Sequence, residues 1–449
     1  MRGHLAERPD LDPRDVGFSL AKGRSAFGHR AVVIGDGLAE LTAGLAAVAG
    51  AEAAADVVTG APGGADGVAF LFTGQGSQRP RMGQELYETF PVFAAAFDEV
   101  CGHLDPLLDR PLRDVVFAAG GAAPLDRTMF TQAGLFALEV ALFRLAEHCG
   151  LRPGHLIGHS IGELAAAHVA GVFGLPDACA LVAARGRLMG RTSADGAMVA
   201  VQAPEERVSL ALAGLDDRVA VAGVNGPAST VISGDARVVE RIAGELAAEG
   251  FRTRRLRVAH AFHSPHMEPI LAEFRAVAAG LAYAEPRIPV VSNVTGDLAG
   301  PGLLTSPDYW VRQIREPVRF LPGVRRLRDT GTGVYVELGP DGTLTAMARA
   351  CLTDDPPEPA AAGSGGASAT AGEPTLVATL RAGRPEGRTV LAALAHAYTR
   401  GPRSTGRGSC PGRGEWNCPR TRSSGGGTGW TPGAGKDRAA PVILWPAGR

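Results

Sequence analysis

Short apolar runs alternate with helical patterns along most of the chain. The start of "GVAFLFTGQGSQ", residues 67–78, is typical of a buried strand that leads into a glycine turn. A second run, "HLIGHS" at residues 155–160, precedes a segment with helical spacing. Residues 90–104 and 130–150 also repeat apolar side chains at helical intervals. Buried strands that alternate with helices predict an α/β fold with a parallel sheet covered on both faces.

Residues 198–258 follow a different order. Their patterns predict strand, helix, strand, strand, helix and strand, which is the order of a ferredoxin-like unit. We therefore expect a βαββαβ subdomain inserted into a hydrolase-like, parallel-sheet body, which residues 66–197 and 259–351 form.

The two ends of the chain differ from this body. Residues 1–62 contain a strand pattern and an amphipathic helix, so we expect a small α/β unit there. Residues 352–400 begin with a Pro/Ala/Gly/Ser-rich tract, typical of a flexible linker, and continue with a short strand and a helix. Residues 401–449 are rich in Arg, Gly, Ser and Pro without periodicity, and we expect them to be disordered.

The composition argues against several classes of function. The 449 residues carry a formal net charge of −1 with both signs interspersed, so no basic stripe favours nucleic acid. The N-terminus lacks the apolar core of a signal peptide, and no run of about 20 uncharged apolar residues could span a bilayer. These features predict a cytoplasmic protein without a membrane or nucleic-acid partner. The six cysteines lack metal-ligand spacing, so we expect reduced thiols and no metal.

The motif "GHSIG", residues 158–162, matches the G-x-S-x-G nucleophile elbow. In such an elbow a strained turn from strand to helix exposes the serine hydroxyl, and the glycines make room for the bend. The backbone N–H of Ile161 would then lie at a helix start, where it can stabilise an oxyanion. A serine before a helix is often only an N-cap, but the apolar run before Ser160 favours a nucleophile.

A nucleophilic serine needs a base, and "HAFHSPHMEP" offers His260, His263 and His266. Ser264 and Pro265 are placed as the N-cap and first residue of a helix. Three histidines could also bind zinc. However, no Glu or Asp lies among them, and the segment crosses from strand to helix, so we favour a catalytic base.

Several motifs together resemble the acyltransferase domain of modular type I polyketide synthases. They are "GQGSQ", "GHSIGE", "RGRLM", "NGPASTVISG", "HAFHSPHMEP" and "PVVSNVTG", in that order. The resemblance covers about residues 66–350, and residues 1–62 resemble the end of the linker that joins a ketosynthase to such a domain. We therefore expect a fragment of a synthase.

The resemblance implies roles for the residues that carry these motifs. Ser160 would be the acylated nucleophile and His263 the general base. A backbone carbonyl would orient His263, with Gln313 at the matching position and Asn293 nearby. The backbone N–H groups of Gln75 and Ile161 would form the oxyanion hole.

The same resemblance implies the substrate. Arg185, in "RGRLM", would grip a free carboxylate in a bidentate pair, which favours malonyl over acetyl. Asn225, His260 and Phe262 would also line the substrate site. Phe262 and Ile161 match the malonyl-selecting form of the family, because the bulky Phe262 fills the space that an α-methyl group needs. One methyl group gives only about 10- to 200-fold discrimination, so this preference should be leaky.

We therefore expect transfer of malonyl from malonyl-CoA to the phosphopantetheine thiol of an acyl carrier protein, with no bound cofactor and with a ketosynthase as a second partner. Two alternatives stay open. A serine hydrolase of the α/β-hydrolase type needs the order Ser, Asp or Glu, His, with the histidine near the C-terminus, whereas His263 lies mid-chain. The other alternative is a non-catalytic synthase fragment.

Residues 401–449 suggest how the chain could be a non-catalytic fragment. Residues 401–406 and 416–430 can be back-translated into codons and read one base earlier. The amino-acid sequences that this second reading frame permits resemble the end of the linker that, in this family, runs back to the ketosynthase. Our hypothesis is that the reading frame slips near residue 400, in the gene or in its sequencing. The nucleotide sequence decides it.

Overall fold

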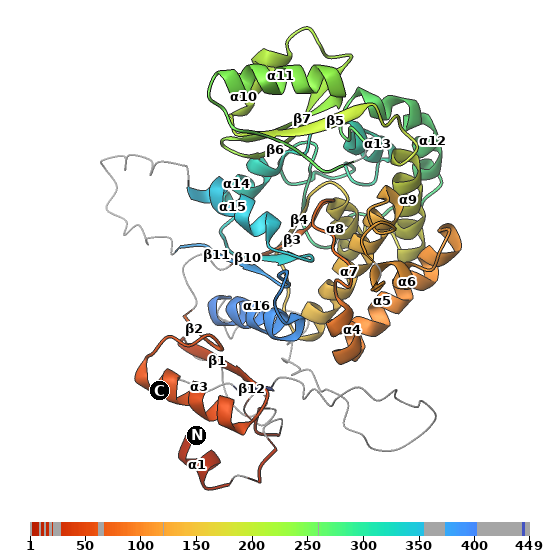
Figure 1. Ribbon diagram of the computed structural model, residues 1–449. Helices are drawn as coiled ribbons and strands as arrows, with labels where there is room; N and C mark the ends of the chain where they lie inside the picture. The colour runs from red at the N-terminus through yellow and green to blue at the C-terminus, as the bar shows by residue number, and fades with distance from the viewer. Residues whose placement is uncertain are drawn as a thin grey trace.

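The computed structural model describes residues 2–8, 10–12, 15–17, 20, 28–61, 67–119, 121–258, 260–353, 373–401 and 442–444. Its largest unit is built on a five-stranded parallel sheet of order β11-β10-β3-β4-β9 (Figure 1). The apolar runs expected to be buried strands are its central strand β3 and the neighbouring strand β4, which confirms the α/β fold. The strands are β3 (Gly67–Phe72), β4 (His155–Gly158), β9 (Val290–Val291), β10 (Thr332–Leu338) and β11 (Thr375–Ala378).

Alternate side chains of β3 enter two different cores. Phe70 and Phe72 pack in the core that the helices on one face of the sheet share, whereas Ala69 and Leu71 pack with Phe320 on the other face. Helices α5, α7, α8, α9 and α16 contribute to the first core, and α14 and α15 contribute to the second. Their bounds are α5 (Pro91–Leu104), α7 (Thr128–His148), α8 (Gly162–Ala170), α9 (Leu175–Met189), α14 (Phe320–Asp329), α15 (Thr343–Thr353) and α16 (Glu386–Arg400).

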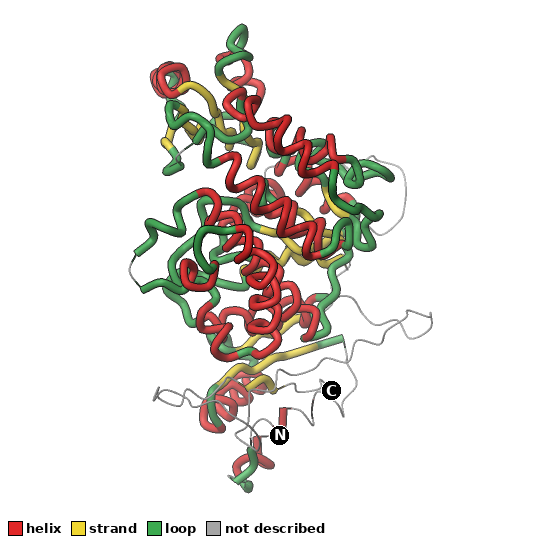
Figure 2. The backbone as a smooth tube through the Cα atoms, turned by 90° about the vertical axis from the view of Figure 1, so that its right-hand side faces the viewer, coloured by secondary structure: helices red, strands yellow, loops and turns green. Residues whose placement is uncertain are grey.

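Shorter elements complete the body around these layers, seen from a second side in Figure 2. They are α4 (Gln84–Thr89), η1 (Asp105–Leu107), α6 (Leu112–Val116), η2 (Pro265–Met267), α12 (Glu268–Ala279) and α13 (Pro307–Arg315). By length and composition α7 could cross a membrane, but 89% of its most apolar window is buried inside the protein. It is therefore the central helix of the core.

The inserted subdomain has the expected ferredoxin-like order. Its four strands form a separate sheet of order β6-β7-β5-β8, in which all neighbours are antiparallel. Val199, Ile232, Ile242 and Leu246 belong to a core of its own. The elements are β5 (Gly196–Val201), α10 (Glu205–Leu212), β6 (Val219–Gly226), β7 (Ser229–Asp235), α11 (Ala236–Ala248) and β8 (Thr253–Arg255).

A third sheet, of order β12-β1-β2, lies near the N-terminus (Figure 1). It consists of β1 (Arg30–Gly35), β2 (Val57–Gly60) and β12 (Val442–Leu444), with α1 (Arg2–Ala6) and α3 (Leu38–Gly50) beside it. The prediction of disorder for residues 401–449 is wrong for Val442–Leu444, which pair antiparallel with β1. Residues 402–441 and 445–449 lie outside the described residues.

The segment after residue 351 is more than a linker. Its strand β11 pairs in parallel with β10, with Val336 opposite Val377, and so forms the edge of the main sheet. Helix α16 packs against β10 and β11. The boundary at residue 351 is therefore corrected, because residues 373–401 complete the α/β body. The Pro/Ala/Gly/Ser-rich tract itself, residues 354–372, lies outside the described residues.

The contact between α8 and β3 leaves no room for a side chain at Gly162. A Cβ built there would lie 2.2 Å from the carbonyl oxygen of Phe72. We expect Gly162→Ala to lower the free energy of unfolding by about 1–3 kcal/mol, as overpacking does. Gly244 on α11 is the matched control, since a Cβ there meets nothing within 4 Å; Gly244→Ala should raise stability by up to about 1 kcal/mol. Denaturant titration measures both, and an unchanged midpoint for Gly162→Ala would contradict the packing argument.

Candidate active site

Ser160 lies on a tight turn between strand β4 and helix α8. Its φ of 54° is in the left-handed region, which non-glycine residues adopt only at a cost of about 1–3 kcal/mol. Glycine at position 158 makes the turn possible, because a Cβ there would lie 2.1 Å from the backbone nitrogen of Glu163. This is the nucleophile-elbow geometry that the motif predicted, at the carboxyl edge of a central strand of the sheet.

His263 faces this serine from the loop before η2. Its Nε2 lies 2.8 Å from Ser160 Oγ, and its Nδ1 lies 2.9 Å from the carbonyl oxygen of Glu316. Since a carbonyl only accepts, Nδ1 carries the proton and Nε2 presents a lone pair to the serine hydroxyl. His263 also has a left-handed φ of 55°. Ser264 caps η2 by accepting a hydrogen bond from His266 N, as expected.

The buried position of His263 keeps its imidazole neutral. Burial, together with the positive charge of Arg185, lowers the pKa of His263 to about 3. The carbonyl of Glu316 opposes this shift, and the backbone of Gln313 does so more weakly. A neutral imidazole that already accepts the serine proton in a hydrogen bond is in the state that a general base requires.

Two residues predicted to orient His263 hold the serine turn through their side chains. Asn293 accepts a hydrogen bond from Ser160 N through Oδ1 at 2.7 Å and donates to the carbonyl of Gly158 at 2.7 Å. The side chain of Gln313 donates to the carbonyl of Ser160 at 2.7 Å. The carbonyl that accepts from His263 Nδ1 at 2.9 Å belongs to Glu316, three residues after Gln313. The backbone of Gln313 acts on the same imidazole more weakly, so its orienting role stays a prediction, whereas the contacts of Asn293 are with the serine turn.

Arg185 reaches the serine from helix α9. It is 1% exposed, and its Nη2 donates to Ser160 Oγ at 3.0 Å and to Gln313 Oε1 at 3.3 Å. Burial lowers the pKa of Arg185 to about 9, and the charge of Glu163 partly offsets this effect. The guanidinium is therefore charged at neutral pH. Its Nε has no hydrogen-bond partner, and within the described part of the chain no carboxylate forms an ion pair with it.

Glu163 anchors the turn from below and was not predicted as part of the site. Its Oε1 accepts hydrogen bonds from Asn293 N at 2.9 Å and from the hydroxyl of Tyr309. Burial raises the pKa of Glu163 to about 7. Glu163 is the second residue of α8, in the otherwise apolar stretch "IGELAAA". An acidic residue in such a stretch is the sequence signal that could have identified it, because Glu is rarely buried without a partner.

The two proposed oxyanion donors lie beside the serine turn. Ile161 follows Ser160 directly at the start of α8, and Gln75 lies in the loop after β3. A Cβ on Gly74 would lie 2.8 Å from His159 Nδ1, so the loop approaches the turn closely. No described residue accepts a hydrogen bond from the N–H of Gln75 or Ile161. Their role in an oxyanion hole stays a prediction.

The remaining predicted substrate residues have identified contacts. The ring of Phe262, 5% exposed, lies 5.9 Å from that of His260, and His260 Nδ1 is 3.3 Å from Thr192 Oγ1. Asn225 accepts a hydrogen bond from His159 Nε2 at 2.9 Å through Oδ1. Asn225 therefore supports the residue next to the nucleophile, and its contact with substrate stays a prediction. The third histidine of the motif, His266, lies with its Nε2 2.8 Å from Asp235 Oδ1.

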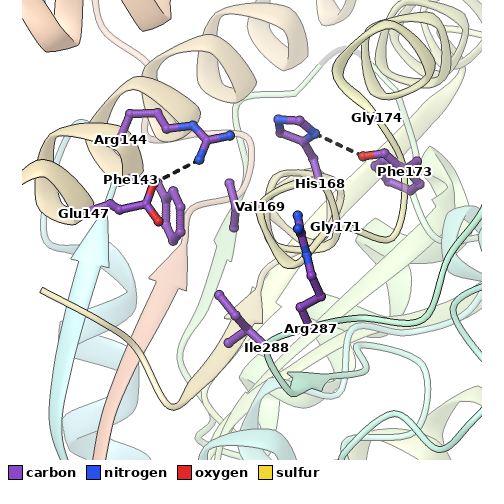
Figure 3. Close-up of a pocket in the computed structure, with 10 residues that line it drawn as sticks. All are labelled: Phe143, Arg144, Glu147, His168, Val169, Gly171, Phe173, Gly174, Arg287 and Ile288. Atoms are coloured by element: carbon purple, nitrogen blue, oxygen red, sulfur yellow. Dashed lines mark hydrogen bonds and ion pairs between the residues drawn. The ribbon is translucent and has the colours of Figure 1, made fainter. Parts of the chain in front are cut away.

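A separate cavity of about 450 Å³ lies at the far end of α8 (Figure 3). His168, Arg144 and Arg287 line it with seven further residues, none of which was predicted as a site residue. His168 Nδ1 lies 3.2 Å from the carbonyl of Phe173, and burial lowers the pKa of His168 to about 4. This cavity is distinct from the Ser160 site.

Comparison with known proteins identifies the family. A sequence profile described as "Acyl transferase domain" matches residues 69–403, most of the chain. The chain belongs to the acyl transferase domain family. The match of this acyltransferase domain to the profile ends close to residue 400, where the frame-slip hypothesis places its change.

The relatives of the acyltransferase domain are polyketide synthases. It is 50% identical to spectinabilin polyketide synthase system protein NorB of Streptomyces orinoci over 405 residues and to polyketide synthase GfsB of Streptomyces halstedii over 406. Each alignment covers 89% of this chain but only 18% and 7% of those proteins. The chain therefore spans a small part of the curated relatives it matches.

Solved structures agree with this placement. The acyltransferase domain from the second module of the salinomycin polyketide synthase has a TM-score of 0.76 at 50% identity, covering 89% of this chain and 90% of that one. Malonyl-CoA:acyl carrier protein transacylase from Xanthomonas oryzae pv. oryzae has a TM-score of 0.59 at 32% identity, covering 64% and 91%. The resemblance of the motifs to a polyketide synthase acyltransferase is thus confirmed.

The neutral state of His263 sets the expected pH dependence. With a pKa of about 3, the imidazole stays unprotonated as the pH falls from 7 to 5. We expect kcat/KM for acylation of Ser160 to change by less than about 2-fold over this range, whereas a base with the ordinary pKa of about 6.5 would lose about 25-fold. Rapid-quench acylation across the range measures it, and a fall with an apparent pKa near 6.5 would contradict a buried, neutral base.

Proposed function

We propose that the domain loads malonyl from malonyl-CoA onto Ser160 and passes it to the phosphopantetheine thiol of an acyl carrier protein. The observation that supports a dicarboxylic acyl group best is Arg185. This buried guanidinium adjoins Ser160 Oγ, and no described residue forms a hydrogen bond with its Nε. A carboxylate held in a bidentate pair is the ligand that such a group binds best. Acetyl has no carboxylate to offer.

The acylation step follows from the contacts of Ser160. Its hydroxyl gives its proton to His263 Nε2 while Oγ attacks the thioester carbonyl carbon. The carbonyl oxygen becomes an oxyanion, which the N–H groups of Ile161 and Gln75 stabilise. The tetrahedral intermediate then collapses, the carbon–sulfur bond breaks, and the departing sulfur takes the proton from His263. Ser160 now carries the malonyl group as an ester.

Transfer repeats these events with a different nucleophile. The carrier thiol gives its proton to His263, its sulfur attacks the seryl ester, and Ser160 Oγ leaves with the proton that His263 returns. The hydrogen bond from His263 Nδ1 to Glu316 keeps Nε2 as the proton-accepting atom in both half-reactions. The domain needs no bound cofactor for this ping-pong sequence.

The choice among malonyl derivatives rests on Phe262. The side chain lies beside His260 in the loop that carries His263, and it is buried. A large ring there reduces the space for an α-methyl group, so we propose malonyl over methylmalonyl with the modest selectivity of about 10- to 200-fold that one methyl allows.

A carrier protein is proposed as the acceptor because the family comprises acyltransferases and one structurally similar protein is a malonyl-CoA:acyl carrier protein transacylase. A cytoplasmic synthase that also includes a ketosynthase is the proposed setting. The hydrolase alternative shares the acyl-enzyme and differs only in the nucleophile that removes the acyl group. Release of free malonate in the presence of carrier protein, without malonyl-carrier, would favour the hydrolase.

Intact mass spectrometry tests the acyl-enzyme directly. Wild-type protein mixed with malonyl-CoA should gain the mass of one malonyl group, and Ser160→Ala should gain none. Methylmalonyl-CoA should give the corresponding adduct about 10- to 200-fold more slowly. An unmodified wild type would refute the catalytic proposal and favour the non-catalytic fragment.

Substitution of Arg185 tests the acyl class. Because charge-assisted hydrogen bonds are worth about 1.5–3 kcal/mol each, Arg185→Gln should lower kcat/KM for malonyl-CoA by at least about 100-fold. The rate with acetyl-CoA should not fall in parallel, since acetyl makes no ion pair. Arg187, on the exposed face of the same helix, provides the matched control Arg187→Gln. Equal losses for malonyl and acetyl would show that Arg185 acts on the serine alone.

A further inference from the structure

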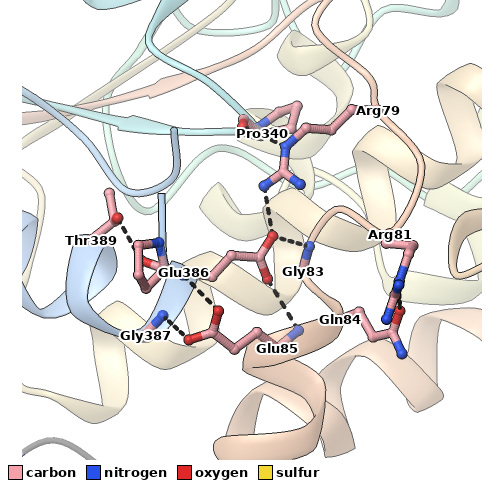
Figure 4. Close-up of polar contacts among 10 residues, drawn as sticks. Arg79, Arg81, Gly83, Gln84, Glu85, Pro340, Glu386, Gly387 and Thr389 are labelled. Carbon is pink, nitrogen blue, oxygen red and sulfur yellow. Dashed lines mark hydrogen bonds and ion pairs between the residues drawn. The ribbon is translucent and has the colours of Figure 1, made fainter. Parts of the chain in front are cut away.

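Glu386, the first residue of α16, is buried beside the loop that follows β3. It is 5% exposed, and its carboxylate accepts three hydrogen bonds (Figure 4). Oε1 accepts from Arg79 Nη2 at 2.6 Å and from Gly83 N at 2.9 Å, and Oε2 accepts from Glu85 N at 3.2 Å. These donors compensate the loss of water around the charge.

Glu85, in the first turn of α4, makes the reciprocal contact. Its carboxylate accepts hydrogen bonds from Glu386 N at 2.9 Å and from Gly387 N at 3.0 Å. The first amides of a helix have no partner within the helix, so each carboxylate satisfies groups at the start of the other helix. The start of α16 is therefore fixed to the start of α4 from both sides.

Arg79 connects this junction to the turn that carries Gln75. The loop leaves the sheet after Phe72, the last residue of β3, and runs to Gly83, the N-cap of α4; Arg79 lies in it four residues after Gln75. Besides its ion pair with Glu386, Arg79 donates from Nε to the carbonyl of Pro340 at 3.3 Å. The segment that carries Gln75 is therefore fixed on one side by strand β3. On the other side it is fixed by the contacts of Arg79 with Glu386 and Pro340.

We propose that Glu386 is a positioning residue for the N–H of Gln75 and acts through Arg79. The role of Gln75 itself rests on the proposed function. An oxyanion donor stabilises the transition state more than the bound substrate, so its displacement lowers kcat and leaves KM almost unchanged. The segment after the linker is then part of the catalytic apparatus, although it contributes no reacting atom.

The test compares Glu386→Gln with Arg388→Gln in the full chain. Arg388 lies two residues after Glu386 on α16 but pairs with Asp36, Glu40 and Asp56 of the N-terminal unit. Its substitution therefore disturbs the packing of α16 without removing a contact to the turn. Glu386→Gln preserves the size of the side chain and removes its charge.

We expect Glu386→Gln to lower kcat for acylation about 10-fold with KM for malonyl-CoA within about 2-fold, since misplaced donors reduce rate more than binding. Arg388→Gln should keep kcat. Hydrogen exchange of the backbone amides in residues 73–83 should accelerate in Glu386→Gln and not in Arg388→Gln. Adding Arg79→Gln to Glu386→Gln should cost less than Arg79→Gln alone, because the two side chains act as one pair.

Equal losses of kcat in both single variants would overturn the proposal in favour of general docking of α16. Unchanged exchange in residues 73–83 would also overturn it, because the loss of charge would then not reach the turn. The exchange measurement needs no activity. If wild-type protein forms no malonyl adduct, the proposed function fails, and the exchange result still decides whether Glu386 holds the turn.

Discussion

Helix α8 meets the end of strand β3 with no side chain at Gly162 between them, and the turn that presents Ser160 depends on this contact. Gly162 brings the helix against the carbonyl of Phe72, which leaves Ser160 on a turn with a left-handed backbone. The N–H of that serine donates a hydrogen bond to Asn293 Oδ1, and the side chain of Gln313 donates one to its carbonyl, so both backbone groups are fixed. The left-handed backbone of Ser160 is strained, and such a conformation persists only where neighbouring residues fix it in this way.

The electrostatics of the site follow from burial as much as from the choice of residues. Arg185 keeps a charge within the core, while His263 nearby stays neutral because burial and that same charge lower its pKa. Glu163 lies near enough to influence Arg185, but its Oε1 accepts hydrogen bonds from Tyr309 and Asn293, and among the described residues its Oε2 makes no hydrogen bond to the guanidinium. The cation is therefore left for a ligand, and an incoming carboxylate would relieve the cost of burying it.

Local sequence patterns predicted the elements and the two central residues of the site. The apolar runs identified β3 and β4, and the strand–helix order identified the ferredoxin-like unit, because these signals repeat within short windows. Support for the catalytic groups was harder to predict. The carbonyl of Glu316 has no side-chain signature, and Glu386 acts on Arg79 across 307 positions of sequence. Such contacts form between segments that are far apart in the sequence and meet only in the folded protein. The periodicity of apolar residues within a short window does not predict them.

Strand β11 gives the main sheet its outer edge, and it comes from beyond the Pro/Ala/Gly/Ser-rich tract. Its backbone groups cover those of β10, a strand whose Val334, Val336 and Leu338 are all buried. A polypeptide that stopped at residue 351 would leave this apolar strand with an open hydrogen-bonding edge. Such an edge can pair with a strand of another chain, which leads to aggregation. By pairing with β10, strand β11 prevents this.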